Sequence, residues 1–467
     1  MALWYDVSDL MHWHLPHLTG IQRTVVGILN GLHSLDVHPR LVKFDEKKFS
    51  FKSLELDDLP QNVLQYIHIS DINQLEISEP EIKPETNQIK EKLKDVLGTD
   101  PITRELVTNV RNFGSAGMSI PKNLIRWLST RINTGNQTES EEQKFENRIC
   151  SLPGNRTNNN RNESSESDVL LSFCASWTIT GHATAVGSLQ SQDVKVVRMI
   201  YDLIPTLKPQ WVLENGQKIF SSWAQSLLCE SDLIFTISEF SKKEIKRYCK
   251  KADIAKPPLE VVRLGDVMEG RNKYSAAKNN GPELTPKLIP DRPFFLCVCT
   301  IDVRKNHRLL YDAWNLMNSR DPESCPDLVC VGSKHLFVKD LIREIKFTPE
   351  VNKRIHILNN INDKDLDWYY NNCIATIYPS RYEGWGLPVA ESLGYGRVCL
   401  ASHATSIPEI SKDLPEFFDP FNVYELLDLI QKCLQDDEWL EQKETEIREV
   451  FTPTPWTHTA TQILNKI

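Results

Sequence analysis

Apolar and polar residues alternate along the chain in an order that predicts parallel β-sheets covered by helices. Near the N-terminus, residues 2–7 form a short apolar run, and from Gly20 onward apolar side chains recur at helical spacing. Residues 37–44 then form a second apolar run. Strand–helix–strand order is typical of a parallel sheet with helices on its faces.

Residues 46–167 interrupt this alternation and read as an insert that is weakly helical in part. The stretch 133–167 is rich in asparagine and poor in large apolar side chains, which predicts disorder. The alternation resumes at Asp168. The expected strands are 169–173, 194–201, 233–237 and 259–264, with helices over 219–228 and 242–251.

A second alternating run follows residues 266–293, which are rich in Asn, Gly, Pro and Lys and predict a domain boundary. The expected strands are 294–301, 327–332, 354–358, 373–378 and 397–401, and helices follow Pro420 and cover 456–467. We therefore expect an α/β chain of two doubly wound, Rossmann-like domains, 1–275 and 290–450, facing each other across a cleft. Ligands of such sheets bind at the carboxyl ends of the strands.

Composition narrows the class of protein. The 467 residues are 40% hydrophobic and 25% charged, which excludes a disordered or fibrous chain. The net charge of −9 argues against a nucleic-acid partner. Eleven cysteines without a Cys-x-x-Cys pair favour a reducing compartment.

We expect a cytoplasmic location, because the N-terminus lacks a secretory signal and no apolar run approaches the roughly 20 residues that span a bilayer. Two local basic stretches, 242–256 and 100–131, could contact anionic lipid at the inner face of the plasma membrane. Ordinary solvated helix faces are the alternative interpretation.

The segment 378–391 carries the sharpest candidate chemistry. Glu383, Gly384 and Gly386 lie in a loop after an expected strand, and a helix containing Glu391 is expected to start near Leu387-Pro388. Glycines let a ligand approach the backbone, helix N-termini attract anions, and carboxylates accept hydrogen bonds from sugar hydroxyls. The alternative is a tight turn with one capping and one exposed glutamate.

Three further segments carry candidate binding residues at the end of an expected strand or at the start of an expected helix. Arg304 and Lys305 follow strand 294–301 and could hold a diphosphate, or form a solvated basic turn. Gly20 could admit a phosphate at a helix start, or only begin the helix. Tyr201 and Asp202 end a strand, so Asp202 could orient an acceptor hydroxyl or begin a turn before Pro205.

Two metal interpretations are weak. Asp365-Leu-Asp367 could bind a divalent ion, but helical spacing after it favours an acidic helix start. His12, His14 and His17 could bind zinc, but no acidic or cysteine ligand is near, and an acceptor-side loop is favoured.

Together these segments resemble the family-4 retaining glycosyltransferases of GT-B fold, over most of both domains except the insert. The resemblance implies that Gly20, Arg304 and Lys305 face the donor diphosphate, Glu383 the transferred sugar and Glu391 the ribose. Weaker matches lie at 237–241, 406–409 and 418–420. The remaining donor-binding residues implied are Ser238, Gly384, Trp385, Gly386, Leu387 and Pro388.

This chain departs from the family pattern at two places. Many relatives have histidine where Tyr201 stands, so no histidine role carries over. Relatives often have Gly-Arg where this chain has Cys299-Thr-Ile-Asp302, so phosphate binding would depend more on Arg304 and Lys305. The resemblance also implies that the terminal helix, 451–467, packs across the domain interface.

The resemblance implies a glycosyltransferase of bacterial cell-surface polysaccharide synthesis. It would move a hexosyl group from a nucleotide sugar, with GDP-mannose the first expectation, to a glycan or lipid-linked acceptor with retention of configuration. Glu383, Asp202, Arg304 and Lys305 would be catalytic, and no metal or other cofactor is expected. A GT-B sugar-nucleotide epimerase and an inactive GT-B scaffold are the alternatives; a dinucleotide oxidoreductase would need a Gly-x-Gly-x-x-Gly motif that this sequence lacks.

Overall fold

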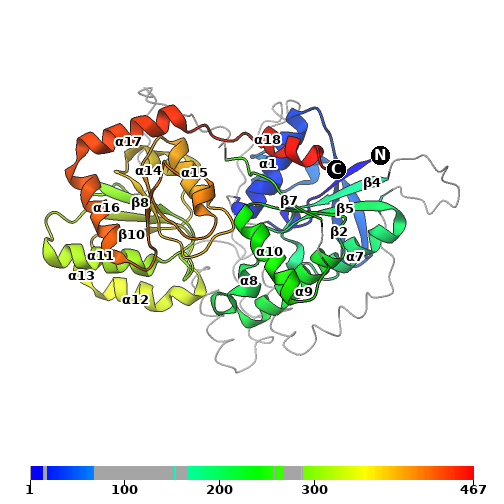
Figure 1. Ribbon diagram of the computed structural model, residues 1–467, viewed down its shortest axis with the longest axis horizontal. Coiled ribbons are helices and arrows are strands. Elements are labelled where there is room, and N and C mark those ends of the chain that lie inside the picture. Colours follow the sequence, from blue (N-terminus) through cyan, green and yellow to red (C-terminus); the bar gives the residue numbers. More distant parts are fainter. Residues whose placement is uncertain are drawn as a thin grey trace, which may run out of the picture.

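The structure is a computed structural model that describes residues 2–13, 18–67, 152–153, 167–255, 258–266, 286 and 288–467. These residues form two α/β halves, each a sheet with helices on its faces (Figure 1). The expected fold class, two doubly wound Rossmann-like units, is confirmed. Most of the insert and of the expected boundary 266–293 lies outside the described residues, so the domain limits stay predictions.

The N-terminal sheet has the strand order β3-β2-β1-β4-β5-β6-β7 in the described part of the chain. Its strands are β1 Leu3–Asp6, β2 Arg40–Asp45, β3 Ser50–Leu54, β4 Asp168–Ser172, β5 Val194–Met199, β6 Leu233–Thr236 and β7 Leu259–Val261. All neighbours are parallel except β2 and β3, which form an antiparallel hairpin. Residues 50–54 fall within the stretch 46–167 that we expected to be an insert, and they form the edge strand β3 of this sheet. Phe44 of β2 contacts Phe51 of β3, with ring centroids 5.5 Å apart, and this contact joins the hairpin to the core.

The helices of this half are α1 Gly20–Ser34, α2 Gln61–Leu64, α7 His182–Leu189, α8 Ile204–Leu207, α9 Glu214–Cys229 and α10 Glu239–Lys251. Single turns of 3₁₀ helix occur at Leu10–His12, Leu56–Asp58, Ser176–Thr178, Gln190–Gln192 and Pro209–Trp211. α1, α9 and α10 confirm the helices expected from periodicity. α7 was missed, because its sequence His-Ala-Thr-Ala-Val-Gly-Ser-Leu has few large apolar side chains to mark a face.

The C-terminal sheet has the order β10-β9-β8-β11-β12-β13, with parallel neighbours. Its strands are β8 Phe294–Val298, β9 Asp327–Val331, β10 Ile355–Leu358, β11 Thr376–Tyr378, β12 Cys399–Ser402 and β13 Glu416–Phe418. β13 was not expected, because three residues are too few to show a pattern.

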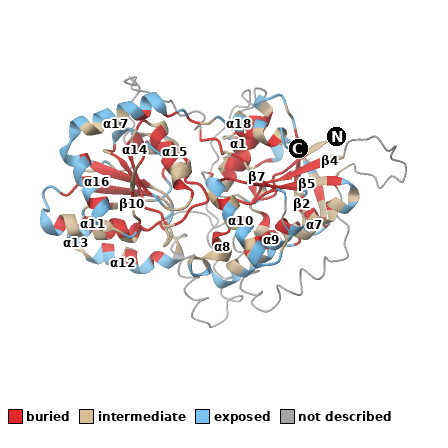
Figure 2. Cartoon of the chain, viewed as in Figure 1, coloured by how far each residue is buried: buried red, intermediate tan, exposed pale blue. Residues whose placement is uncertain are grey.

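The helices of this half are α11 His307–Arg320, α12 Lys339–Phe347, α13 Pro349–Asn352, α14 Asp363–Asn372, α15 Leu387–Gly394, α16 Val423–Gln435 and α17 Asp437–Val450, with 3₁₀ turns at Leu336–Val338 and Ile407–Glu409. Asp365 and Asp367 lie in α14, which Asn362 caps by accepting from the amide of Asp365. Both sheets are buried between helices whose outer faces are exposed (Figure 2). Within the described ranges, no helix has both the length and the apolar character needed to cross a bilayer.

The last helix, α18 Trp456–Leu464, returns to the N-terminal half and packs on α1 (Figure 1). Its Trp456 ring lies where two glycines leave space: a Cβ on Gly27 or Gly265 would come within 2.3 or 2.4 Å of the ring. A Cβ on Gly31 would lie 2.4 Å from the Trp456 carbonyl oxygen. This close approach ties the end of the chain to its beginning.

Strand order determines where a ligand can bind. In the C-terminal sheet, the chain turns from one side of β8 to the other, so β8 and β11 are neighbours although they are far apart in sequence. β1 and β4 are the equivalent pair in the N-terminal sheet. Ligands of open α/β sheets bind beyond the carboxyl ends of such a pair.

Candidate functional site

The loops after β8 and β11 meet at the switch point of the C-terminal sheet. The amide of Arg381 donates to the carbonyl of Arg304 over 2.9 Å. The side-chain amide of Asn306 donates to the carbonyl of Pro379 over 3.1 Å. These bonds fix the loop that carries Arg304 and Lys305 against the loop that carries Glu383.

Glu383 holds both cations. Its Oε1 lies 2.6 Å from Lys305 Nζ and its Oε2 lies 2.6 Å from Arg304 Nη1. The Glu383 side chain is only 8% exposed. Burial raises the pKa of the Glu383 carboxyl, but the charges of Arg304 and Lys305 and hydrogen bonds from Lys305 and Ser380 outweigh it and lower the pKa to about 2. Glu383 is therefore ionised at neutral pH.

The two cations have further partners that fix their positions. Arg304 Nη1 also donates to the carbonyl of Tyr382 over 2.8 Å, and Lys305 Nζ donates to the Tyr378 hydroxyl over 2.7 Å. Burial lowers the pKa of Arg304, but Glu383 and other anionic neighbours raise it above its usual value. Two cations share one ionised carboxylate here, so the cluster carries excess positive charge suited to an anionic ligand.

The glycine loop before α15 depends on two local constraints. Gly386 has φ +136°, a conformation that a side chain would strain. A Cβ on Gly384 would lie 2.9 Å from the Tyr201 carbonyl oxygen, so this glycine lets the two halves approach. Leu387 and Pro388 then begin α15, while the buried Trp385 ring receives the Arg263 guanidinium 5.1 Å from its centroid.

Glu391 lies inside α15, as expected, and is 3% exposed. Its Oε1 accepts from Arg23 Nη1 of α1 over 2.6 Å, and its Oε2 accepts from the Tyr370 hydroxyl over 2.9 Å. Arg23 thus crosses from the N-terminal half to the carboxylate expected to bind ribose. Arg23 was not among the residues that we expected at the site.

Two of the residues that we expected to contact the donor, Gly20 and Ser238, lie in the N-terminal half and have different surroundings. Gly20 is exposed at the start of α1, with open space around it. Ser238 is fully buried, and its hydroxyl caps α10 by accepting from the Ser241 amide over 3.0 Å. Donor binding by Ser238 stays a prediction. The same helix end binds Glu409 of the other half, because the amides of Glu239 and Phe240 donate to it over 2.8 and 2.7 Å.

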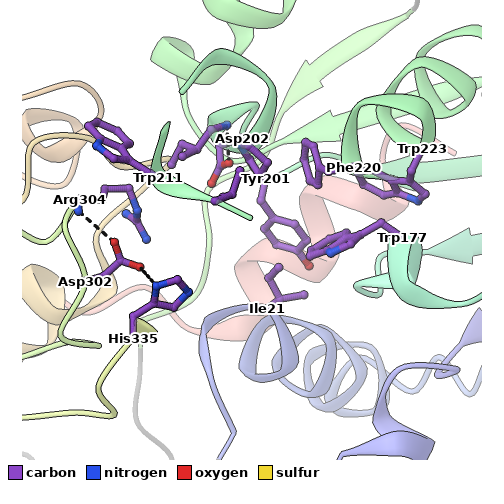
Figure 3. A pocket seen from close by; sticks show the side chains of 13 residues that line it. Ile21, Trp177, Tyr201, Asp202, Trp211, Phe220, Trp223, Asp302, Arg304 and His335 are labelled. Atoms are coloured by element: carbon purple, nitrogen blue, oxygen red, sulfur yellow. Dashed lines mark hydrogen bonds and ion pairs between the residues drawn. The ribbon is translucent and has the colours of Figure 1, made fainter. Parts of the chain in front are cut away.

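A cavity of about 240 Å³ lies between the halves, beside this cluster (Figure 3). Arg304, Asp302 and His335 line it from the C-terminal half. Asp202 lines it from the N-terminal half, and burial raises the pKa of its carboxyl while Arg304 opposes the rise. Its remaining lining is largely aromatic and apolar: Ile21, Trp177, Tyr201, Ile204, Pro205, Trp211, Val212, Phe220 and Trp223.

The aromatic side of the cavity was not foreseen from the sequence. Trp177 packs edge-on against Phe220 and Trp223, with ring centroids 5.3 and 5.2 Å apart, and Trp211 contacts Tyr382 at 6.2 Å. The Tyr201 hydroxyl donates to the Phe173 carbonyl over 2.8 Å, so it is already engaged within the protein. The high tryptophan content, 11 residues, was the signal available for this side. Of the three histidines in the first loop, His12 is exposed, and His14 and His17 lie outside the described residues.

Comparison with known protein families and curated proteins gives the following matches. Residues 285–450 match the family described as "Glycosyl transferases group 1". The serotype-specific mannosyltransferase WbdA of Escherichia coli is 25% identical over 263 residues, which cover 54% of this chain and 30% of WbdA. The O-antigen chain mannosyltransferase B of Escherichia coli is 27% identical over 285 residues, which cover 58% of this chain and 69% of that protein. The match thus spans less than a third of the length of WbdA.

Two solved structures resemble the whole chain. Sucrose-phosphate synthase from Thermosynechococcus elongatus aligns with a TM-score of 0.55 at 15% identity, covering 100% of this chain and 98% of the other. A glycosyltransferase from Rickettsia africae aligns with a TM-score of 0.52 at 12% identity, covering 100% and 97%. At these identities the likeness concerns the fold. The chain therefore has the GT-B fold, and its residues 285–450 are similar to the group 1 glycosyl transferase family.

Proposed function

We propose that this protein transfers a hexosyl group, mannosyl from GDP-mannose in the first instance, to a glycan or lipid-linked acceptor. The observation that carries the proposal is the Arg304–Lys305–Glu383 cluster, placed at the switch point of one sheet and beside a cavity shared with the other half. The mannosyltransferase names of the two Escherichia coli relatives support mannose as the sugar. Synthesis of a bacterial surface polysaccharide is the corresponding role.

The donor diphosphate would bind at Arg304 and Lys305, with amides at the start of α15 completing its contacts. Glu391 would accept hydrogen bonds from the ribose, and Arg23, which pairs with Glu391, would also bind the nearby phosphate. Glu383 would face the transferred sugar, where an ionised carboxylate favours positive charge at the anomeric carbon. The fixed cations take the part that a divalent metal plays at other diphosphate sites, so no metal is required by this scheme.

The reaction breaks the bond between the anomeric carbon and the diphosphate oxygen, and forms one to the acceptor oxygen. The proton of the acceptor hydroxyl passes to the departing phosphate on the same face of the sugar, and the configuration is retained. Asp202, across the cavity from Arg304, would orient the acceptor hydroxyl. Rings such as Trp177 and Trp211 offer the flat apolar surfaces on which sugar faces pack.

The test compares Lys305→Ala with Lys346→Ala, an exposed lysine on α12. Purified proteins receive a panel of nucleotide sugars and a glycan acceptor, and product is quantified by mass spectrometry. Lys305→Ala should lower turnover by roughly 10²–10³-fold, the usual effect of removing one preorganised donor, while Lys346→Ala keeps the wild-type rate.

Product analysis also separates the rival functions. An α-linked product from an α-linked donor, seen by nuclear magnetic resonance, supports retention. An altered sugar nucleotide formed without acceptor would replace the proposal by an epimerase, and absence of turnover with every donor would favour an inactive scaffold. Equal rates in Lys305→Ala and wild type would overturn the site assignment.

A membrane-side acceptor fits the charge on α10. Lys243, Lys246, Arg247, Lys250 and Lys251 are exposed on this helix. A cytoplasmic enzyme docked at the inner face of the plasma membrane through this face would reach lipid-linked acceptors. Sedimentation with anionic but not neutral vesicles, reduced in Lys243→Glu/Lys246→Glu/Lys250→Glu, is the expected result; equal sedimentation of this variant would contradict it.

A further inference from the structure

Two thiols and an imidazole converge at the base of the loop that carries Arg304 and Lys305. Cys297 is in β8, Cys299 follows the end of that strand, and His307 is the first residue of α11. The two sulfur atoms are 3.7 Å apart, and each is 3.8 Å from Nε2 of His307. Cys297 and His307 are buried, and Cys299 is partly exposed.

These separations match the geometry of a tetrahedral metal site. With Zn–S bonds of about 2.3 Å and Zn–N bonds of about 2.0–2.1 Å, tetrahedral angles place two sulfur ligands about 3.8 Å apart and sulfur and nitrogen about 3.5 Å apart. A disulfide would need a sulfur–sulfur distance of about 2.05 Å, far shorter than observed. Three donor atoms at nearly equal spacing leave one point that all of them can reach.

The ring of His307 is oriented toward this point. Its Nδ1 is buried and has no hydrogen-bond partner among the described residues, so Nε2, facing the two thiols, carries the polar contacts of the ring. Sulfur and imidazole ligands together select zinc over the hard cations that prefer oxygen.

A second cluster in the described part of the chain shows the contrast. Asp6, Cys174 and His182 also lie close together, but Asp6 Oδ2 accepts directly from His182 over 2.7 Å and from Ser172 over 2.7 Å. This carboxylate is satisfied by the protein, and its short contacts leave no position for an ion between ligands. The cluster on β8 and α11 has the longer, even spacing that an ion requires.

We propose that Cys297, Cys299 and His307 bind one zinc ion that ties the end of β8 to the start of α11. The loop 300–306 leaves the site at Cys299 and returns to it at His307, so the ion would fix both ends of the segment that carries Arg304 and Lys305. None of the three ligands lines the cavity. The ion is therefore a positioning element for the loop and takes no part in the proposed transfer.

The first test measures zinc content, which does not depend on the proposed function. Wild type, Cys299→Ala, His307→Gln and the control Cys433→Ala, a buried thiol in α16, are reconstituted with zinc, dialysed and analysed by mass spectrometry of the metal. Wild type and Cys433→Ala should retain about one zinc per chain, and the two ligand variants should lose most of it. Wild type without zinc, or ligand variants with as much zinc as wild type, would overturn the proposal.

A second measurement uses only the wild-type chain, so it does not depend on whether the ligand variants fold. Cobalt(II) added to the metal-free wild-type chain should give the visible absorption of a tetrahedral site and the near-ultraviolet band of cobalt bound to thiolate, and zinc should displace both. Absence of the thiolate band would refute the ligand assignment even if every variant were insoluble. Removal of zinc should also weaken GDP binding several-fold, and this last effect rests on the proposed donor site; the metal content and the cobalt spectrum remain valid whichever donor is found.

Discussion

Replacing Glu383 by glutamine removes the negative charge that Arg304 and Lys305 share and keeps the shape of the side chain. The pKa of Glu383 falls from 4.5 to about 2 in the folded protein, because the two cations and hydrogen bonds more than offset burial. At about 1.36 kcal/mol for each pKa unit, the charged form is stabilised by roughly 3 kcal/mol on folding. Glu383→Gln should therefore reduce the free energy of unfolding at neutral pH by about this amount.

The stabilisation by the Glu383 carboxylate should depend on pH in one direction. A carboxyl whose pKa is lowered on folding contributes its stabilisation above the unfolded value, 4.5, and loses it as the pH falls toward about 2. Urea unfolding of wild type and Glu383→Gln should thus differ by about 3 kcal/mol at pH 7; about half of that difference should be gone by about pH 3, and most of it by about pH 2. The control Glu323→Gln, an exposed partner of Arg292, should match wild type closely at each pH.

The same variant should separate binding from chemistry. Without the internal carboxylate, Arg304 and Lys305 are free to pair with phosphate, so calorimetry should show GDP binding at least as tight as in wild type, while mannosyl transfer is lost. Equal stability of variant and wild type at pH 7, or a stability difference that stays constant down to pH 3, would refute the ionic account of this cluster.

Two further variants test the packing of α18 on α1 and the ion pair that joins the two halves. Gly31→Ala places a Cβ 2.4 Å from the Trp456 carbonyl oxygen, so α18 must shift, and thermal unfolding should show that the protein loses roughly 1–3 kcal/mol of stability. The control Gly216→Ala, which has open space around its Cβ, should not destabilise the protein. A Gly31→Ala variant as stable as wild type would contradict the close packing. Arg23→Ala leaves the buried carboxylate of Glu391 without its cation and should lower the free energy of unfolding by about 1–2 kcal/mol. The loss is smaller than for a fully buried ion pair, because the Arg23 side chain is 35% exposed. An unchanged unfolding midpoint would show that this ion pair contributes nothing to stability.

The fold could be predicted from the sequence because its strands are mostly uninterrupted apolar runs separated by periodic helices. Phe294–Val298 is such a run, and α1 shows one apolar face clearly. The elements that were missed lack these signals: α7 is built from small residues, and β13 has three residues. β3 is the edge strand of its sheet and follows β2 through a short turn to form a hairpin, so strand–helix alternation gave no reason to expect it.

The candidate site could be predicted only in part. Arg304 and Glu383 each follow a strand, and parallel strands present such residues at one edge of the sheet. By contrast, Arg23 and Glu391 are 368 positions apart and meet only because the two halves dock in one particular way. No local sequence pattern carries that information. For the same reason, the sequence did not predict that the tryptophans would line the cavity.

The packing of Trp456 on α1 has a consequence for the synthesis of the chain. α1 is translated before the C-terminal half, but the helix that covers its glycine face is translated after that half. Until then, the surface around Gly27 and Gly31 stays open on the nascent chain, although the neighbouring strands β1 and β2 have long been made. The N-terminal half therefore completes its packing only after the whole C-terminal half and α18 have been translated.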